Sequence, residues 1–78
     1  MAPKADLRVH LRRFRKTRDL TQQDLADRLG VTRQTIISIE KGKYRPSIEL
    51  ALLLAREFAC PVEDLFELVE GDADGLDS

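Results

Sequence analysis

The amino-acid sequence predicts an all-α fold, built as a single domain of five helices. The chain has 78 residues, enough for one domain that buries about 60% of the surface of its unfolded chain. Apolar residues recur at spacings of three and four, the period of an amphipathic helix. Favoured helix N-caps precede most of these segments, and glycine follows two of them. The folded domain is expected to span residues 1–70, with the acidic, aperiodic segment 71–78 as a disordered tail.

The first helix is expected to run from about residue 6 to residue 17 or 18, with Asp6 as its N-cap. Leu7, Leu11 and Phe14 stand at positions i, i+4 and i+7, which would place them on one buried face. His10 lies beside this face and has no second metal ligand, so we expect it to pack or to lie at the surface. The remainder of the helix is basic, with Arg8, Arg12, Arg15, Lys16 and Arg18.

Two short helices should follow, at residues 21–30 and 32–41. The first has Thr21 as its N-cap and Gly30 as its left-handed terminator, and the second is bounded in the same way by Thr32 and Gly42. Leu25 and Leu29 would face the core from the first helix, and Ile36 and Ile39 from the second. Two helices joined by a short turn containing glycine, with a polar second helix, form the helix-turn-helix pattern.

At these positions the chain resembles Cro and the phage repressors, helix-turn-helix proteins of the xenobiotic-response-element family. The resemblance runs from about Leu7 to Phe66. The matching positions are Gln22, Leu25, Ala26, Gly30, Val31, Thr32, Arg33, Gln34, Ile36, Ile39, Glu40, Gly42, Pro46 and Ser47. It implies a lambda-repressor-like fold and a small transcriptional repressor that binds double-stranded DNA sequence-specifically. It also implies an ion pair between Arg15 and Glu40, which would neutralise an acid close to phosphate.

The helix at residues 32–41 supplies the expected base contacts. Arg33 can form two hydrogen bonds with guanine, Gln34 can do the same with adenine, and Ser38 offers a further polar contact. Thr35 is expected to contact a phosphate or a thymine methyl group. Ile37 stands where the family is usually polar, and two interpretations remain open: it packs on thymine methyl groups, or it leans toward the core.

Phosphate contacts are expected around the same helix. The loop that follows it carries three cations and a phenol, and several of its backbone amides are expected to be free, so it would clamp phosphates. The family uses this loop in that way. Gln22 could donate its amide to a phosphate at the start of the preceding helix. The expected phosphate-contacting residues are Gln22, Thr32, Lys41, Lys43, Tyr44 and Arg45.

The charge is divided unevenly along the chain. Residues 1–47 contain twelve Lys or Arg and five Asp or Glu, for a charge of +7. Residues 48–78 contain one basic residue and nine acidic ones, for −8, so the formal net charge is only −1. The positive half coincides with the helix-turn-helix pattern, which favours contact with nucleic acid.

Ser47 should cap a fourth helix, residues 48–59, which is apolar almost all round. Ile48, Leu52, Ala55 and Ala59 are expected to form its main buried face, widened by Leu50, Leu53, Leu54 and Phe58. A fifth helix is expected at residues 61–68, where Pro61 suits the first turn.

The apolar residues near the end of the fifth helix have little chain after them to cover them. We expect Leu65, Phe66, Leu68 and Val69 to form a homodimer interface, so that two copies bind a pseudo-palindromic operator. The alternative is a monomer with a small exposed apolar patch.

Several other classes of protein are not favoured. No apolar run reaches the ~20 residues of a membrane span and no signal-peptide segment is visible, so we expect a cytoplasmic protein. Cys60 has no partner for a disulfide or a zinc site, and we interpret it as a core thiol. No catalytic constellation, cofactor site or small-molecule site is visible, so we do not expect an enzyme. The alternative function is an antitoxin-like or adaptor module whose DNA binding is secondary.

Overall fold

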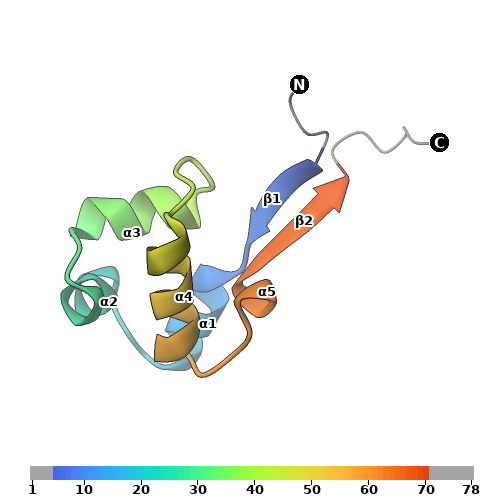
Figure 1. Ribbon diagram of the computed structural model, residues 1–78. Helices are drawn as coiled ribbons and strands as arrows, with labels where there is room; N and C mark the ends of the chain where they lie inside the picture. Colours follow the sequence, from blue (N-terminus) through green and yellow to red (C-terminus); the bar gives the residue numbers. More distant parts are fainter. Residues whose placement is uncertain (1–4, 71–78) are drawn as a thin grey trace.

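The computed structural model describes residues 5–70 and contains five helices and a two-stranded sheet. The helices form the body, and the two strands extend away from it as a ribbon (Figure 1). In chain order the elements are β1 (Ala5–Val9), α1 (Leu11–Thr17), α2 (Gln22–Leu29), α3 (Arg33–Glu40), α4 (Ile48–Glu57), α5 (Val62–Leu65) and β2 (Phe66–Glu70). The expected disordered tail, residues 71–78, lies outside the described residues.

The prediction of an all-α fold is therefore only approximate, and both ends of the domain differ from it. Residues 5–9 form a strand, so the helix expected from Asp6 begins instead at Leu11, with His10 as its N-cap. The fifth helix begins at Val62, with Pro61 as its N-cap rather than in its first turn, and it stops at Leu65 rather than continuing to residue 68. The two terminal segments pair antiparallel with each other. This long-range pairing overrides the weak local preference of both segments for helix.

The ribbon is amphipathic. Leu7 pairs with Leu68 and Val9 pairs with Phe66, and alternation along each strand places these four side chains on one face. The charged pair of Arg8 and Glu67 lies on the other face. Val9 and Phe66 pack against the core, which seats the inner half of the ribbon on the helices.

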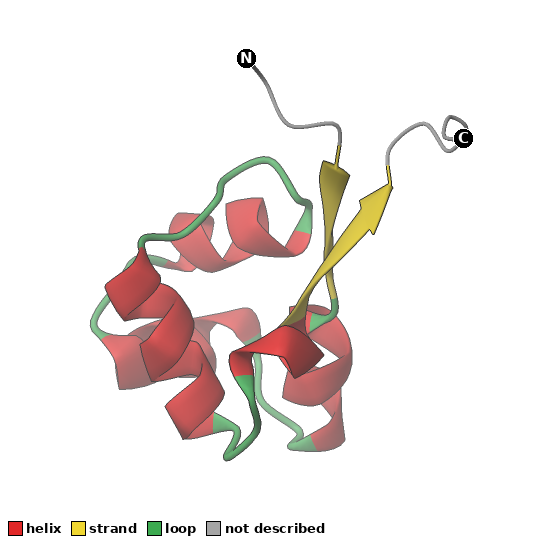
Figure 2. Cartoon of the chain, turned by 45° about the vertical axis from the view of Figure 1, so that its right-hand side comes forward, coloured by secondary structure: helices red, strands yellow, loops and turns green. Residues whose placement is uncertain are grey.

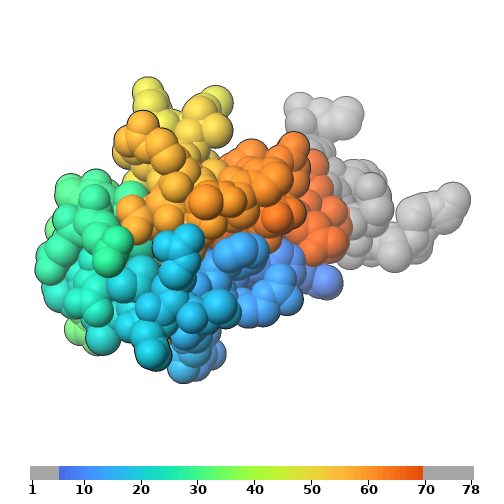
Figure 3. Space-filling view, turned by 90° about the horizontal axis from the view of Figure 1, so that it is seen from below, coloured from blue at the N-terminus to red at the C-terminus, as the bar shows by residue number. Residues whose placement is uncertain are grey.

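His10 ties the base of the ribbon to the helical body. Its backbone N–H donates to the carbonyl of Leu65 at 2.8 Å, and its Nε2 lies 2.9 Å from Oε1 of Glu67. Figure 2 shows the strands rising from the point where α1 begins and α5 ends. In Figure 3 the blue N-terminal and orange C-terminal segments lie side by side on one face. The two strands are thus connected to the helices, and to each other, at this junction.

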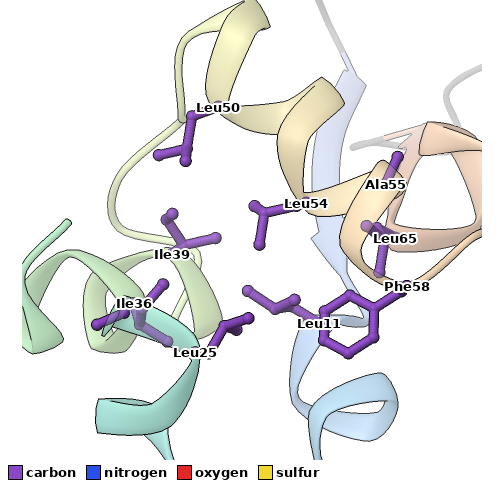
Figure 4. Close-up of a cluster of buried hydrophobic side chains, with 10 residues drawn as sticks. Leu11, Leu25, Ile36, Ile39, Leu50, Leu54, Ala55, Phe58 and Leu65 are labelled. Carbon is purple, nitrogen blue, oxygen red and sulfur yellow. The ribbon is translucent and has the colours of Figure 1, made fainter. Parts of the chain in front are cut away.

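The core receives side chains from every helix (Figure 4). Its fully buried large side chains are Leu11, Leu25, Ile36, Ile39, Leu54 and Leu65. Leu65 is completely buried inside its own chain and Phe66 is partly buried against the same core, so the structure contradicts Leu65 as a dimer-interface residue. α5 turns Leu65 inward instead.

The buried face of α4 also differs from the prediction. Leu50, Leu54 and Ala55 face the core, whereas Ile48 is 77% exposed and Leu52 is 55% exposed. Ala59, also expected on that face, is exposed beyond the end of the helix. Because α4 is apolar on nearly every side, periodicity alone could not select the face that its neighbours cover. Among residues 5–70, no helix has the length and apolar character needed to cross a membrane.

Candidate nucleic-acid interface

α2, a short turn and α3 form a helix-turn-helix unit with well-defined ends. The Thr21 hydroxyl accepts from the N–H of Asp24, and the Asp24 carboxylate accepts from the N–H of Thr21, both at 2.9 Å. The hydrogen bond from the Thr21 backbone holds the pKa of Asp24 below its usual range. Gly30 ends α2 with a φ of 72°, and the Thr32 hydroxyl then caps α3 by accepting from Thr35 N–H at 3.2 Å. These caps confirm the predicted boundaries.

α3 presents a polar surface opposite its buried stripe. Ile36 and Ile39 are fully buried, as predicted. The residues predicted to contact bases lie on the remaining surface of this one helix: Arg33 and Gln34 are exposed, and Thr35, Ile37 and Ser38 are partly exposed. Two hydrogen bonds order this surface, from Gln34 Nε2 to Ser38 Oγ at 3.3 Å and between the hydroxyls of Thr32 and Thr35 at 3.0 Å. Both are exposed and can exchange for contacts to a ligand.

Arg15 and Glu40 form the ion pair that the resemblance implied. Arg15 Nε donates to Glu40 Oε2 at 2.6 Å, and Nη2 donates to Oε1 at 3.1 Å. The Arg15 Nη1 atom also donates to the carbonyl of Leu20 at 2.8 Å. This buried network fixes α1 against α3 and neutralises the acid at the end of α3.

Gln22 joins this network. Its Nε2 donates to Glu40 Oε1 at 3.2 Å, so the side chain predicted to reach a phosphate is already oriented by an acid. An amide NH₂ group carries two hydrogens. Gln22 can therefore keep this bond and donate its second hydrogen outward.

The loop after α3 differs from the prediction in one respect. Four of its backbone amides are not free, because those of Lys41, Gly42, Lys43 and Tyr44 all donate to carbonyls in α3. These hydrogen bonds end the helix, and Gly42 just beyond it adopts a left-handed conformation with a φ of 75°. The side chains of Lys41, Lys43, Tyr44 and Arg45 remain exposed, so any phosphate contact from these four residues falls to their side chains.

An open groove of about 780 Å³ runs between α1, the start of α2 and α3. Its charged lining residues are Arg12, Arg15, Lys16, Arg33 and Lys41, together with Asp19 and Glu40. Ile37 also lines the groove, so it faces outward rather than into the core. Arg12 and Lys16 were not among the predicted site residues. Their spacing of four residues on a helix was the available signal, because it places them on one face.

The titratable groups outside this surface include one free cysteine, Cys60. Within residues 5–70, no group of three or more His, Cys, Asp or Glu side chains is placed to hold a metal ion. Cys60 is partly buried against the core, and desolvation raises the pKa of its thiol. A raised pKa favours the neutral thiol, which is less reactive than the thiolate.

The packed core, the capped helix pair and its exposed polar helix define a helix-turn-helix domain. A family model described as helix-turn-helix matches residues 11–65, and the chain belongs to the Cro and phage-repressor type of this family. The family consists of DNA-binding transcription regulators that are generally not enzymes, which supports a role in DNA-binding regulation.

Several proteins of known sequence are similar to this chain. An uncharacterized HTH-type transcriptional regulator of Methanocaldococcus jannaschii is 55% identical over 56 residues, covering 72% of this chain and 85% of that protein. One from Methanothermobacter thermautotrophicus is 50% identical over 68 residues, covering 86% and 99%. The cryptic phage CTXphi transcriptional repressor RstR of Vibrio cholerae is 33% identical over 64 residues, covering 82% and 58%.

Proposed function

We propose that this protein is a cytoplasmic transcriptional repressor that reads the major groove of double-stranded DNA with α3. The observation that carries the proposal is the exposed polar surface of α3, which has cations in the groove beside it and in the loop that follows it. Arg12 and Lys16 line the groove on one side, and Lys43 and Arg45 are exposed in the loop that follows the helix. The similarity to a phage repressor supports repression as the outcome of binding.

Base recognition is assigned to α3. Arg33 and Gln34 are exposed, and their side chains suit two-point hydrogen bonding to guanine and adenine. Ser38 adds a polar contact once its 3.3 Å bond to Gln34 is exchanged. Thr35 and Ile37 supply methyl groups for contact with thymine, and the outward position of Ile37 favours that role over a core role.

Phosphate binding is assigned to side chains on both sides of this helix. On the groove side these are Gln22, Arg12, Lys16 and Lys41, and in the loop they are Lys43, Tyr44 and Arg45, with Thr32 at the start of the helix. Cations beside a reading helix and in the loop after it are suited to contact the phosphates that border a major groove. The contacts with phosphate set the orientation, and α3 supplies the sequence preference.

The protein is further proposed to act as a homodimer on a pseudo-palindromic operator with half-sites ~34 Å apart. Of the residues first expected at the interface, Leu68 remains available because it is 71% exposed, and Val69 is partly exposed. Leu65 is withdrawn because its own chain buries it, and Phe66 is largely committed to the core.

The test is selection of bound sequences from a random duplex pool at near-physiological salt. A two-fold symmetric consensus with half-sites one helical turn apart is expected. The Arg33→Ala variant should lose one position of that consensus, whereas Glu63→Gln, at an exposed site on α5, should recover it unchanged. Binding without any consensus would overturn the proposal and favour the antitoxin-like or adaptor function.

A further inference from the structure

The apolar face of the ribbon continues beyond the core that supports it. Val9 and Phe66 pack against the helices, but the next pair outward, Leu7 and Leu68, has no comparable cover. Leu68 is 71% exposed and Leu7 is partly exposed. Within residues 5–70 the sheet contains only β1 and β2, so each strand has one edge without a strand partner.

Such a ribbon is an incomplete structure by itself. A two-stranded sheet is marginally stable in water, and it is stabilised by further strands or by cover on its apolar face. An unpaired strand edge also exposes a row of N–H and C=O groups that can accept another strand. The outer half of this ribbon thus combines an exposed leucine pair with a free edge.

We infer that β1 pairs antiparallel with β1 of a second copy of this chain, about a two-fold axis at Leu7. The product is one four-stranded sheet in the order β2, β1, partner β1, partner β2. This inference rests on the homodimer of the proposed function and assigns its interface.

Charge complementarity selects both the partner and the register. Centring on Leu7 places Asp6 opposite the partner subunit's Arg8, and the symmetry repeats this pair. Centring on Asp6 would instead oppose two acids, and centring on Arg8 would oppose two cations. If the two-fold axis lay between two residues instead, the register would shift by one residue. The partner's leucines would then lie on the face that carries the charged residues. Of these registers, only the one centred on Leu7 pairs opposite charges across the axis and keeps the leucines of both copies on one face.

The same register aligns the side chains across all four strands. Because Leu7 pairs with Leu68 in each chain, one face carries the row Leu68, Leu7, the partner's Leu7 and the partner's Leu68. The opposite face carries Glu67, Arg8 and the partner's Asp6, which alternate in sign. Both helical bodies lie on the leucine face, each beside Val9 and Phe66 of its own chain, and so at opposite ends of the strands.

The free edge of β2 is less suitable. Centring a two-fold axis on Leu68 would place Glu67 opposite the partner's Val69, with no opposite charge to meet it. β2 carries two acids, Glu67 and Glu70, and no cation. Only β1 holds an acid and a base at the symmetric positions.

The first test uses paired charge reversals and measures molar mass by sedimentation equilibrium of the full chain. The wild type should sediment at twice its chain mass of 8.9 kDa. Asp6→Arg and Arg8→Asp should each shift to one chain mass, because each creates like charges across the axis. An equimolar mixture should return to the doubled mass, because the two variants are complementary. Loss of folding could not produce this recovery.

A second test uses a cross-link that depends on the axis. Leu7→Cys in a Cys60→Ser background should form an intermolecular disulfide on mild oxidation, because Leu7 faces its own copy. Asp27→Cys, exposed on α2, is the matched control and should remain uncross-linked. A wild type that sediments as a monomer, or single charge variants that both remain dimeric without a Leu7→Cys cross-link, would overturn the inference.

These outcomes are separable from failure of the DNA-binding proposal. A dimer that behaves as described but selects no DNA consensus would retain this interface and reject sequence-specific recognition. A symmetric DNA consensus with no cross-link at Leu7 would retain recognition and reject β1 pairing.

Discussion

Arg15 and Glu40 meet in a buried two-point ion pair, with Nε to Oε2 at 2.6 Å and Nη2 to Oε1 at 3.1 Å. Their side chains are only 9% and 6% exposed. The pair joins α1 to the end of α3, so it controls how the polar surface of α3 is oriented relative to the cations of α1. Its integrity matters for stability and for the shape of the DNA-facing surface.

Glu40→Ala should lower the free energy of unfolding by about 3 kcal/mol, because it leaves the Arg15 guanidinium buried without its counter-charge. Urea unfolding measures the change. The Arg15→Met, Glu40→Leu double variant should lose less than Glu40→Ala, because neither charge remains. A loss below about 1 kcal/mol for Glu40→Ala would contradict the network, since exposed pairs contribute no more than that.

Gln34→Ala should relax the preference at one base pair of each half-site, by about 1 to 3 kcal/mol of discrimination. The reason is that Gln34 is exposed on α3 and has no positive charge that would attract phosphates of any sequence. Competition binding with single-base operator variants measures the effect. Equal weakening on operator and random DNA would show instead that this side chain does not read sequence.

Lys43→Ala and Lys16→Ala should each weaken binding to operator and random DNA about equally, because both side chains are assigned to phosphate. Each should flatten the slope of log affinity against log salt by about one unit. Arg56→Ala is the matched control, since Arg56 is exposed on α4 and lies outside the groove. An unchanged salt slope for Lys16→Ala would remove α1 from the interface.

Gly30→Ala should destabilise the fold by about 1 kcal/mol, because a side chain disfavours left-handed backbone. The φ of Gly30 is 72° and no side chain or backbone from elsewhere in the fold lies within 4 Å of an added Cβ, so backbone strain rather than collision is the cause. Asp19 has a φ of 58°, so it is a non-glycine residue in left-handed backbone, and the opposite substitution can be made there. Asp19→Gly should stabilise the fold slightly, and thermal unfolding of both variants should give shifts of opposite sign.

The hydrogen bond that lowers the pKa of Asp24 predicts an acid-sensitive helix cap. A carboxyl whose pKa is lowered by folding adds stability above its ordinary pKa of 3.8, and that stability is lost as pH falls through the lower folded value. Asp24→Asn should therefore reduce the acid dependence of unfolding in this range. Asp27→Asn is the control, because Asp27 accepts from the Gln23 side chain rather than from a cap amide. Identical pH profiles for the two variants would exclude this account.

The sequence by itself determined the helix-turn-helix unit, because local chemistry specifies it. Thr21, Gly30 and Thr32 mark ends that the backbone adopts through nearby hydrogen bonds and one left-handed residue. The spacing of Ile36 and Ile39 selects the buried stripe of α3 and therefore its polar face. The charge division pointed to the same surface.

Only the tertiary structure decided the ends of the domain and the outer face of α4. The pairing of residues 5–9 with residues 66–70 joins segments far apart in the sequence. The local pattern of apolar residues therefore could not predict it. α4 is apolar on nearly all sides, so its packing against the other helices determines which of its leucines are buried. Interactions between residues close in the sequence can be predicted from the local sequence pattern. Strand pairing and helix orientation cannot, because they depend on which distant surfaces come into contact.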